Sequence, residues 1–284
     1  MEQKMMTNDR SRIIRCGKHT LDLSKKTYIM GILNATPDSF SDGGRFDSVE
    51  LAVQRAKEMV ADGADIIDIG GESTRPGGEK VSLEEELRRV VPVISAVAKA
   101  VDVPISVDTY KAEVAHQAIV AGAHIINDVW GAKADPQMAE VASQHRAPII
   151  LMHNRTNRDY VEFMPDVLAD LKDSVAKVVK AGVSLDAIIL DPGIGFVKTQ
   201  AQNLETMRNL HKIVALGYPV LLGTSRKSMI GHVLDLPVED RVEGTAATVC
   251  LGIERGCSIV RVHDVKAMSR TAKMMDAMLE IGRM

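Results

Sequence analysis

The sequence predicts an α/β protein folded as a (β/α)8 barrel of the TIM type, and three observations support this prediction. First, eight short apolar runs have the length and β-branched content of buried strands: 28–34, 64–70, 103–108, 123–129, 147–153, 187–191, 218–225 and 257–264. Second, segments with apolar residues at helical spacing separate these runs, and glycines stand where the helices should end. Third, eight such units across residues 28–284 average about 32 residues each, which suits this barrel.

The chain before the first run predicts a tail and a hairpin. Residues 1–12 are polar and charged and are expected to form a disordered tail. The segment 13–23 places Gly17 and Lys18 between two short apolar runs, which predicts a short N-terminal β-hairpin that closes the bottom of the barrel. Because no later segment has the composition of a linker, residues 1–284 are expected to form a single domain.

The helices between the runs follow from periodicity and capping. Ser82 followed by Glu85 is a capping-box pattern that opens a helix reaching about Ala100. An apolar stripe on the last helix fits either a contact with the barrel or a dimer surface; it consists of Met268, Ala272, Met275 and Leu279. A doubly wound open sheet is the alternative fold, because it shares the alternation of strands and helices.

Composition excludes several classes of protein. The 35 Lys and Arg residues nearly balance the 38 Asp and Glu, and nine aromatic rings are too few for a row of base-stacking platforms, so no nucleic-acid partner is expected. No run of about 18 apolar residues suggests a membrane span, and the polar start is unlike a signal peptide. Three cysteines without a CxxC pair fit a reducing compartment, so a cytoplasmic protein is expected.

The polar residues that end the apolar runs are candidate site residues. In a barrel of this type the C-terminal ends of the strands surround one shared pocket, although any single polar end also fits a solvated loop. The candidates are Asn34, Asp68, Glu72, Thr74, Arg75, Asp108, Asn127, Asp128, His153, Asn154, Asp191, Ser225, Lys227, Arg261 and His263. Among them, Asp108, Asn127 and Asp191 supply two carboxylates and an amide, which suit a heterocycle with N–H donors.

Cationic residues near the last two strands point to a phosphorylated substrate. Arg261 and His263 alternate with valines and so leave the last strand on one face. The neighbouring GTSRKS segment, 223–228, is expected to open a helix with Ser225 as its cap, beside the Lys227 ammonium. The histidines show no zinc-ligand spacing, but Asn34 beside a phosphate suits Mg²⁺, which prefers oxygen ligands.

Several segments, in this order, resemble bacterial dihydropteroate synthase. They are GILNATPDSFSDGG, DIIDIGGESTRPG, SVDT, INDVWG, LMH, LDPGIGF, GTSRKS and RVHD, and they span about residues 28–265. Fingerprints of Rossmann and P-loop nucleotide binding are absent. The loops at 34–46 and 71–78 carry Asp38, Phe40, Phe46 and Arg75 and are expected to close over a second substrate.

The resemblance implies condensation of 6-hydroxymethyl-7,8-dihydropterin diphosphate with p-aminobenzoate, giving 7,8-dihydropteroate and diphosphate with the help of Mg²⁺. By this resemblance the pterin is held by Asp108, Asn127, Met152, Asp191 and Lys227. The diphosphate is contacted by Asn34, which also binds the metal, and by Thr74, Arg261 and His263. The p-aminobenzoate is held by Arg75, Pro76, Phe196, Lys227 and Ser228.

An SN1-like order of events fits these residues. Once the charge of the diphosphate is neutralised, it leaves first, and the remaining pterin methylene cation needs a nearby carboxylate, for which Asp108 is the candidate. The arylamine then attacks as a neutral nucleophile that needs positioning more than deprotonation. The expected catalytic residues are Asp108, Lys227, Arg261 and His263.

Two departures and two alternatives accompany the resemblance. Val197 stands where the family often has a small residue, which is expected to alter the p-aminobenzoate pocket, and Asn154 and Arg155 lie in a variable segment without an assigned role. A pterin-dependent methyltransferase barrel or an inactive pterin-binding homologue would share the fold. The family also implies a homodimer and inhibition by sulfonamides, which resemble p-aminobenzoate.

Overall fold

The strands of the computed structural model close into the predicted barrel. The structure describes residues 12–35, 45–72 and 81–282. Its eight parallel strands are β3 (Tyr28–Asn34), β4 (Ile66–Gly70), β5 (Ile105–Asp108), β6 (Ile125–Asp128), β7 (Ile149–Met152), β8 (Ile188–Asp191), β9 (Leu221–Leu222) and β10 (Ile259–Val262). They pair in the order β8-β7-β6-β5-β4-β3-β10-β9. A parallel bridge between Leu190 and Val220 joins the two ends of this order, which excludes the open doubly wound sheet.

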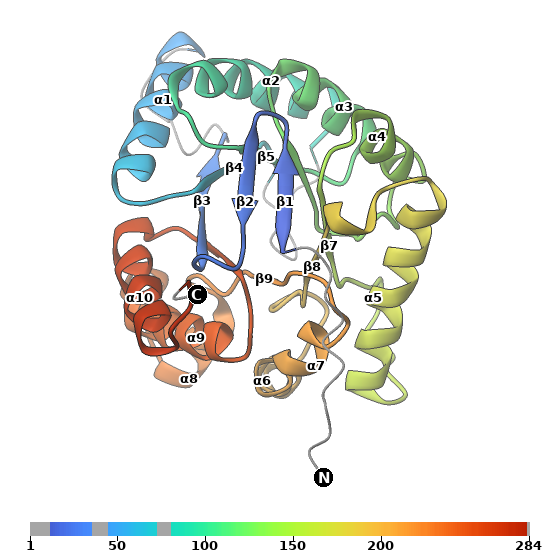
Figure 1. The fold of residues 1–284 in the computed structure, drawn as a ribbon, viewed down its shortest axis with the longest axis vertical. Helices are drawn as coiled ribbons and strands as arrows, with labels where there is room; N and C mark the ends of the chain where they lie inside the picture. The colour runs from blue at the N-terminus through green and yellow to red at the C-terminus, as the bar shows by residue number, and fades with distance from the viewer. Residues whose placement is uncertain (1–11, 36–44, 73–80, 283–284) are drawn as a thin grey trace.

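Helices alternate with the strands and surround them (Figure 1). They are α1 (Arg45–Ala61), α2 (Leu83–Ala100), α3 (Ala112–Ala121), α4 (Met138–His145), α5 (Phe163–Lys180), α6 (Gln200–Arg208), α7 (Leu210–Val214), α8 (Ser228–Leu234), α9 (Val242–Glu254) and α10 (Val265–Met278). Short 3₁₀ turns occupy Leu185–Ala187 and Val238–Asp240. Strand residues that face outward pack with the apolar faces of these helices in two large clusters of buried side chains.

The predicted hairpin is confirmed and lies across one end of the barrel (Figure 1). Strands β1 (Ile13–Cys16) and β2 (His19–Asp22) pair in antiparallel register, and Gly17 adopts a positive φ of 59° in the turn between them. The ladder extends to Arg12, whose carbonyl accepts from the Leu23 amide at 2.8 Å. The disordered tail was expected over residues 1–12, but Arg12 belongs to the hairpin ladder, and residues 1–11 lie outside the described residues.

The hairpin completes the floor of the barrel. Ile14, Cys16, Leu21 and Leu23 of the hairpin segment are buried against the first inward-facing side chains of the barrel strands. Those barrel side chains are Tyr28, Met30, Ile66, Ile125, Ile150, Ile189, Leu221 and Ile259. The interior is therefore filled mainly by apolar side chains at the bottom, with Ser106 as a polar exception, and the charged inward-facing groups lie toward the opposite, C-terminal end.

Helix ends and helix faces bear on three further expectations. Ser82 caps α2 as predicted by accepting from the Glu85 amide at 3.2 Å, while the Glu85 side chain pairs with Arg88 and Arg89. Met268 and Ala272 of α10 are buried in the core, so this part of the apolar stripe is a barrel contact. Among the described residues, no helix is long and apolar enough to cross a membrane.

Replacing Ile14 with alanine is expected to lower the free energy of unfolding by about 2–5 kcal/mol, because it leaves a cavity in the floor of the barrel. Ile14 is fully buried, whereas its neighbour Ile13 is 38% exposed. Ile13→Ala is the matched control and should cost less than about 1 kcal/mol. Urea unfolding followed by circular dichroism measures both, and equal losses would contradict the role of the hairpin in the core.

Candidate active site

The alternation of side chains along the strands brings the predicted site residues to the barrel interior. On most strands the inward residue of the floor is followed two positions later by a second inward residue. These second residues are Asp68, Asn127, Met152, Asp191 and Arg261, and Asp108 faces inward on β5 above Ser106. Five of these six side chains are polar, so they form a layer of charged and amide groups directly above the apolar floor.

Arg261 is held between two buried carboxylates in this layer. Its Nε donates to Asp68 Oδ2 at 2.6 Å, and its Nη2 donates to Asp108 Oδ2 at 2.7 Å. Burial works to lower the pKa of Arg261, but the two carboxylates outweigh it and raise this pKa above its usual value. Arg261 is therefore a permanent cation at the centre of the site, and it ties β10 to β4 and β5.

The carboxylates around Arg261 keep unused oxygens. Asp68 Oδ2 also accepts from Asn127 Nδ2 at 3.1 Å. Asp68 Oδ1 and Asp108 Oδ1 are buried and have no hydrogen-bond partner among the described residues. Burial raises the pKa of Asp108 above its usual value, although Arg261 opposes this shift. An unpartnered buried carboxylate oxygen costs free energy, so the site is built to receive N–H donors or positive charge there.

Four of the strand ends form a row at one level of the barrel. Asn34 is opposite Gly70, Gly70 is opposite Asp108, and Asp108 is opposite Asn127 in the parallel register. Gly70 leaves room in this row, since a Cβ at that position would lie 3.3 Å from the Cβ of Asp108. The register thus brings together the predicted metal ligand and two of the predicted pterin ligands.

Asp191 and Lys227 lie close enough on the other side of the barrel mouth for each charge to influence the other. Asp191 lies opposite the buried Met152, and its Oδ1 accepts from the Gly193 amide at 2.7 Å. Burial raises the pKa of Asp191, although the Lys227 ammonium opposes the shift. Burial lowers the pKa of Lys227 to about 8, and here Asp191 opposes the shift. The two groups therefore form a partly desolvated pair of opposite charge.

Phe196, which the resemblance assigns to p-aminobenzoate, lies beside Lys227. Lys227 Nζ donates to the Ile194 carbonyl and lies 4.9 Å from the centroid of the Phe196 ring. Ser228, the first residue of α8, is exposed and follows Lys227 directly in the chain. Thr74, Arg75 and Pro76 lie outside the described residues, as do Asp38 and Phe40, and the Phe46 side chain is likewise not described.

One expectation about the last loops is wrong. Ser225 does not cap α8, because the helix begins three residues later and its N-cap position is Lys227. Instead, Ser225 Oγ accepts from the His263 amide at 3.1 Å and lies 2.9 Å from His263 Nδ1. Arg226 pairs with Asp264 at 2.9 and 2.5 Å. Ser225 and Arg226 therefore fix the loop after β9 against the loop after β10, which positions His263.

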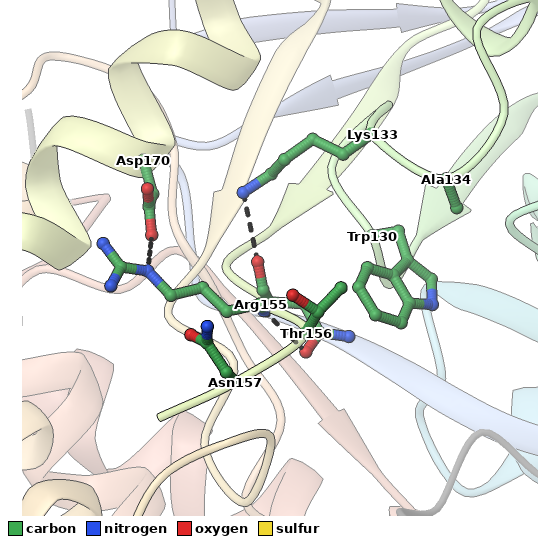
Figure 2. A pocket seen from close by; sticks show the side chains of 8 residues that line it. Trp130, Lys133, Ala134, Arg155, Thr156, Asn157 and Asp170 are labelled. Carbon is green, nitrogen blue, oxygen red and sulfur yellow. Dashed lines mark hydrogen bonds and ion pairs between the residues drawn. The ribbon is translucent and has the colours of Figure 1, made fainter. Parts of the chain in front are cut away.

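The Asn154–Arg155 segment lines a separate pocket of about 510 Å³ beside β6 and β7 (Figure 2). Figure 2 shows Arg155 turned toward Asp170 and Lys133 turned toward the backbone, where it donates to the Asn154 carbonyl at 3.1 Å. The Arg155–Asp170 pair also reaches His153, whose Nε2 lies 3.0 Å from Asp170 Oδ2. Lys133, Arg155 and Asp170 therefore bond to other groups of the protein in this pocket.

The donor chemistry near Asn34 fits Mg²⁺ bound together with a substrate. No group of three His, Cys, Asp or Glu residues in the described ranges is arranged to hold a metal by itself. Asn34 presents an exposed amide at the end of β3. Mg²⁺ commonly uses one or two protein oxygens and takes its other ligands from water and substrate phosphates, so a single amide oxygen is compatible with this ion.

Sequence reasoning left two functional residues without a role. Asp68 was named only as one of many strand ends, although a lone carboxylate between Ile67 and Ile69 in a buried strand already indicates a buried partner. Lys198 was not identified at all. It is buried, and its contacts cross from β8 to the end of β7, which no local pattern records.

Comparisons of sequence and fold with known proteins identify the family of this chain. The family model described as pterin binding enzyme matches residues 30–263. Dihydropteroate synthase of Bacillus subtilis strain 168 is 61% identical over 276 residues, which is 97% of each chain.

Two solved structures align over nearly the whole chain. A Clostridium difficile dihydropteroate synthase with pteroic acid has 51% identity and a TM-score of 0.89, covering 91% of this chain and 98% of its own. A Xanthomonas albilineans dihydropteroate synthase with 4-aminobenzoic acid has 39% identity and a TM-score of 0.90, covering 95% and 99%. The chain therefore belongs to the pterin-binding enzyme family and, within it, to the dihydropteroate synthases.

Proposed function

We propose that this chain joins 6-hydroxymethyl-7,8-dihydropterin diphosphate to p-aminobenzoate, giving 7,8-dihydropteroate and diphosphate, as a transferase that moves the pterin methylene group to an arylamine. The observation that carries the proposal is the polar layer above the barrel floor, in which Asp108, Asn127 and Asp191 converge beside Arg261 and Lys227. Related enzymes with pteroic acid and 4-aminobenzoic acid share the fold and much of the sequence.

The pterin half of the substrate is assigned to the inward-facing polar groups. The Asp191 carboxylate receives the 2-amino and ring N–H groups, and Asn127 contacts a neighbouring edge of the heterocycle. Met152, buried opposite Asp191, packs on the ring face. Asp108 has one oxygen on Arg261 and the other unpartnered among the described residues, so Oδ1 faces the pterin.

Departure of diphosphate is assigned to the residues between β10 and β3. The C–O bond of the methylene group breaks, and its electron pair leaves with diphosphate. Arg261 uses Nε and Nη2 for Asp68 and Asp108, and its Nη1 donates to no described residue. We therefore assign the Nη1 hydrogens to the oxygens of the leaving diphosphate. His263 and Thr74 are assigned to the diphosphate as well. Asn34 would hold Mg²⁺ together with the substrate, and the bound ion would further neutralise the charge of the leaving group.

The arylamine attacks the cation that remains. Asp108 stabilises the positive methylene group by its charge, and the nitrogen lone pair of p-aminobenzoate forms the new C–N bond and then releases a proton to solvent. Lys227 carries the positive charge closest to the Phe196 ring in the described part of the site and serves the carboxylate-bearing substrate. Arg75, Pro76 and Ser228 complete this half, which sulfonamides would occupy as analogues of p-aminobenzoate.

Location and assembly belong to the same proposal. Cys16, Cys250 and Cys257 are all free thiols, which supports a reducing, cytoplasmic location. Exposed apolar side chains on α8 and α10 support a homodimer: Val233, Leu234, Met274 and Met278.

A coupled assay of diphosphate release tests the function. With both substrates and Mg²⁺ present, we expect steady release of diphosphate together with formation of dihydropteroate. Omitting p-aminobenzoate, the pterin substrate or Mg²⁺ in turn is expected to reduce the rate to background, because the reaction needs a nucleophile, an electrophile and neutralisation of the leaving group. Methyl transfer without diphosphate release would favour the methyltransferase alternative, and no reaction at all would favour an inactive homologue.

Arg261→Ala is expected to lower kcat/KM by about two or more decades, because a desolvated contact to the leaving oxyanion is lost. The variant also leaves Asp68 and Asp108 buried without their cation, so unfolding should become easier by about 3–5 kcal/mol. Steady-state kinetics are therefore measured at a temperature where circular dichroism shows the variant to be folded.

Arg226→Ala is the matched control for this substitution. It removes an arginine that is also paired, with Asp264, but in a partly exposed position outside the layer above the floor. Its kcat/KM should fall less than that of Arg261→Ala by at least about tenfold. Activity of Arg261→Ala within twofold of wild type would contradict the assigned role.

A further inference from the structure

The segment 192–198 between β8 and α6, here called the β8–α6 loop, carries two groups of the site. It presents the Ile194 carbonyl, which accepts from Lys227 Nζ, and the Phe196 ring, which lies beside the same ammonium. Its backbone is ordered by internal bonds, since the Phe196 amide donates to the Gly193 carbonyl at 3.2 Å and the Gly195 amide to Asn203 Oδ1 at 2.7 Å.

Lys198 is the last residue of this loop and is 5% exposed, and its side chain turns back to the loop's own backbone. Its Nζ donates to the Gly193 carbonyl at 2.9 Å, to the Phe196 carbonyl at 3.3 Å and to His153 Nδ1 at 2.8 Å. An ammonium group has three hydrogens, so these three acceptors match it fully. In the described part of the chain no carboxylate lies within ion-pair distance of this ammonium, so its direct partners are the two loop carbonyls and His153.

His153, the acceptor that directly follows β7, is itself held in place by hydrogen bonds. Because His153 Nδ1 accepts from Lys198, its Nε2 carries the hydrogen and donates to Asp170 Oδ2, which also pairs with Arg155. Burial lowers the pKa of His153 to about 4, although the hydrogen bond with Asp170 opposes this, so the imidazole is neutral near pH 7. Lys198 is thus tied through His153 to α5 as well as to the loop.

The loop needs such support because part of its backbone is unfavourable. Val197 has a φ of 45°, a left-handed conformation that a β-branched residue rarely adopts. Its carbonyl accepts from the Tyr160 hydroxyl at 3.1 Å. Gly193 also has a positive φ, and a Cβ there would lie 2.0 Å from the His153 carbonyl. Strain of this kind persists only where neighbouring contacts hold it, and Lys198 contacts the loop on both sides of Ile194.

We propose that Lys198 is a positioning residue for the arylamine half of the site: it holds the β8–α6 loop so that the Ile194 carbonyl and the Phe196 ring orient the Lys227 ammonium. This inference rests on the proposed function, since that function assigns Phe196 and Lys227 to p-aminobenzoate. Lys198 itself touches no substrate and acts through the loop.

The charge state of Lys198 fits this role. Burial lowers its pKa to about 7, although the nearby Asp191 carboxylate opposes the shift and Lys227 adds to it. The neutral amine has only two hydrogens and would leave one of the three acceptors without a donor. The three observed contacts of Lys198 Nζ therefore correspond to the protonated form, in which both loop carbonyls are held.

Lys198→Met tests the proposal, because it keeps the length of the side chain and removes all three donors. We expect KM for p-aminobenzoate to rise about tenfold or more, with the dissociation constant of the pterin substrate changed by less than about twofold. A merely structural role would lower the amount of active enzyme and leave KM unchanged. Lys133→Met is the matched control, since Lys133 is also a partly buried lysine beside His153 but donates to Asn154 rather than to the loop.

Hydrogen exchange of the loop amides supplies a second readout. Exchange at Gly195 and Phe196 should be faster in Lys198→Met than in wild type and unchanged in Lys133→Met. If Lys198→Met does not fold, Lys198→Gln, which is shorter and uncharged and retains two donors, is measured against wild type, and its KM for p-aminobenzoate should still rise more than twofold. A folded variant with KM within twofold of wild type and unchanged loop exchange overturns the proposal.

The two proposals fail in different ways. If the wild-type chain releases no diphosphate, the proposed function is wrong, and the exchange rates alone then decide whether Lys198 holds the loop. If the wild type is active and Lys198→Met changes neither KM nor exchange, the function stands and the role of Lys198 is wrong.

Discussion

The structure of the site depends on one interaction, the ion pair of Arg261 with two buried carboxylates. A charged group inside a barrel is tolerated only when it is paired and hydrogen-bonded, and Arg261 meets this condition through Asp68 and Asp108. These three residues come from β10, β4 and β5, so their pairing also fixes the relative positions of three strand ends. The apolar floor, closed by the hairpin, excludes water from below and makes this pairing strong.

The rest of the site is arranged around this pair. A single oxygen of Asp68 accepts from both Arg261 and Asn127, so it fixes the position of the guanidinium relative to the amide on β6. Asp108 uses one oxygen for Arg261 and keeps the other for a ligand. On the opposite side of the mouth Asp191 and Lys227 form a second pair of opposite charge, and the β8–α6 loop fixes the lysine. The half of the site proposed to hold the pterin is thus built on strands, and the geometry of the other half depends on a loop.

Much of this was accessible from the sequence, and the exceptions have physical reasons. Apolar runs predicted the strand positions, because strands buried on both faces consist almost entirely of apolar residues. The polar residues at the ends of these runs identified Asp108, Asn127 and Asp191 as site candidates. The expectation that Ser225 caps α8 was wrong because its hydroxyl bonds to His263, 38 residues away, in preference to the local helix. Lys198 was missed because its partners His153 and Gly193 are brought together only by the closed barrel. The periodicity of apolar residues predicts which side chains are buried and which side of a strand or helix they lie on. It does not predict which polar groups bond to each other across the fold.

The central claim is that Asp68 organises the proposed pterin half by holding Arg261 and Asn127 with its Oδ2. Calorimetric titration of Asp68→Asn and wild-type protein with pteroic acid tests this most directly, because the substitution keeps the shape of the side chain and removes its charge. We expect the affinity to fall by about tenfold or more, since the charged hydrogen bond of about 1.5–3 kcal/mol that orients Asn127 toward the pterin is weakened. An affinity within twofold of wild type, in a variant that is folded, would contradict the account.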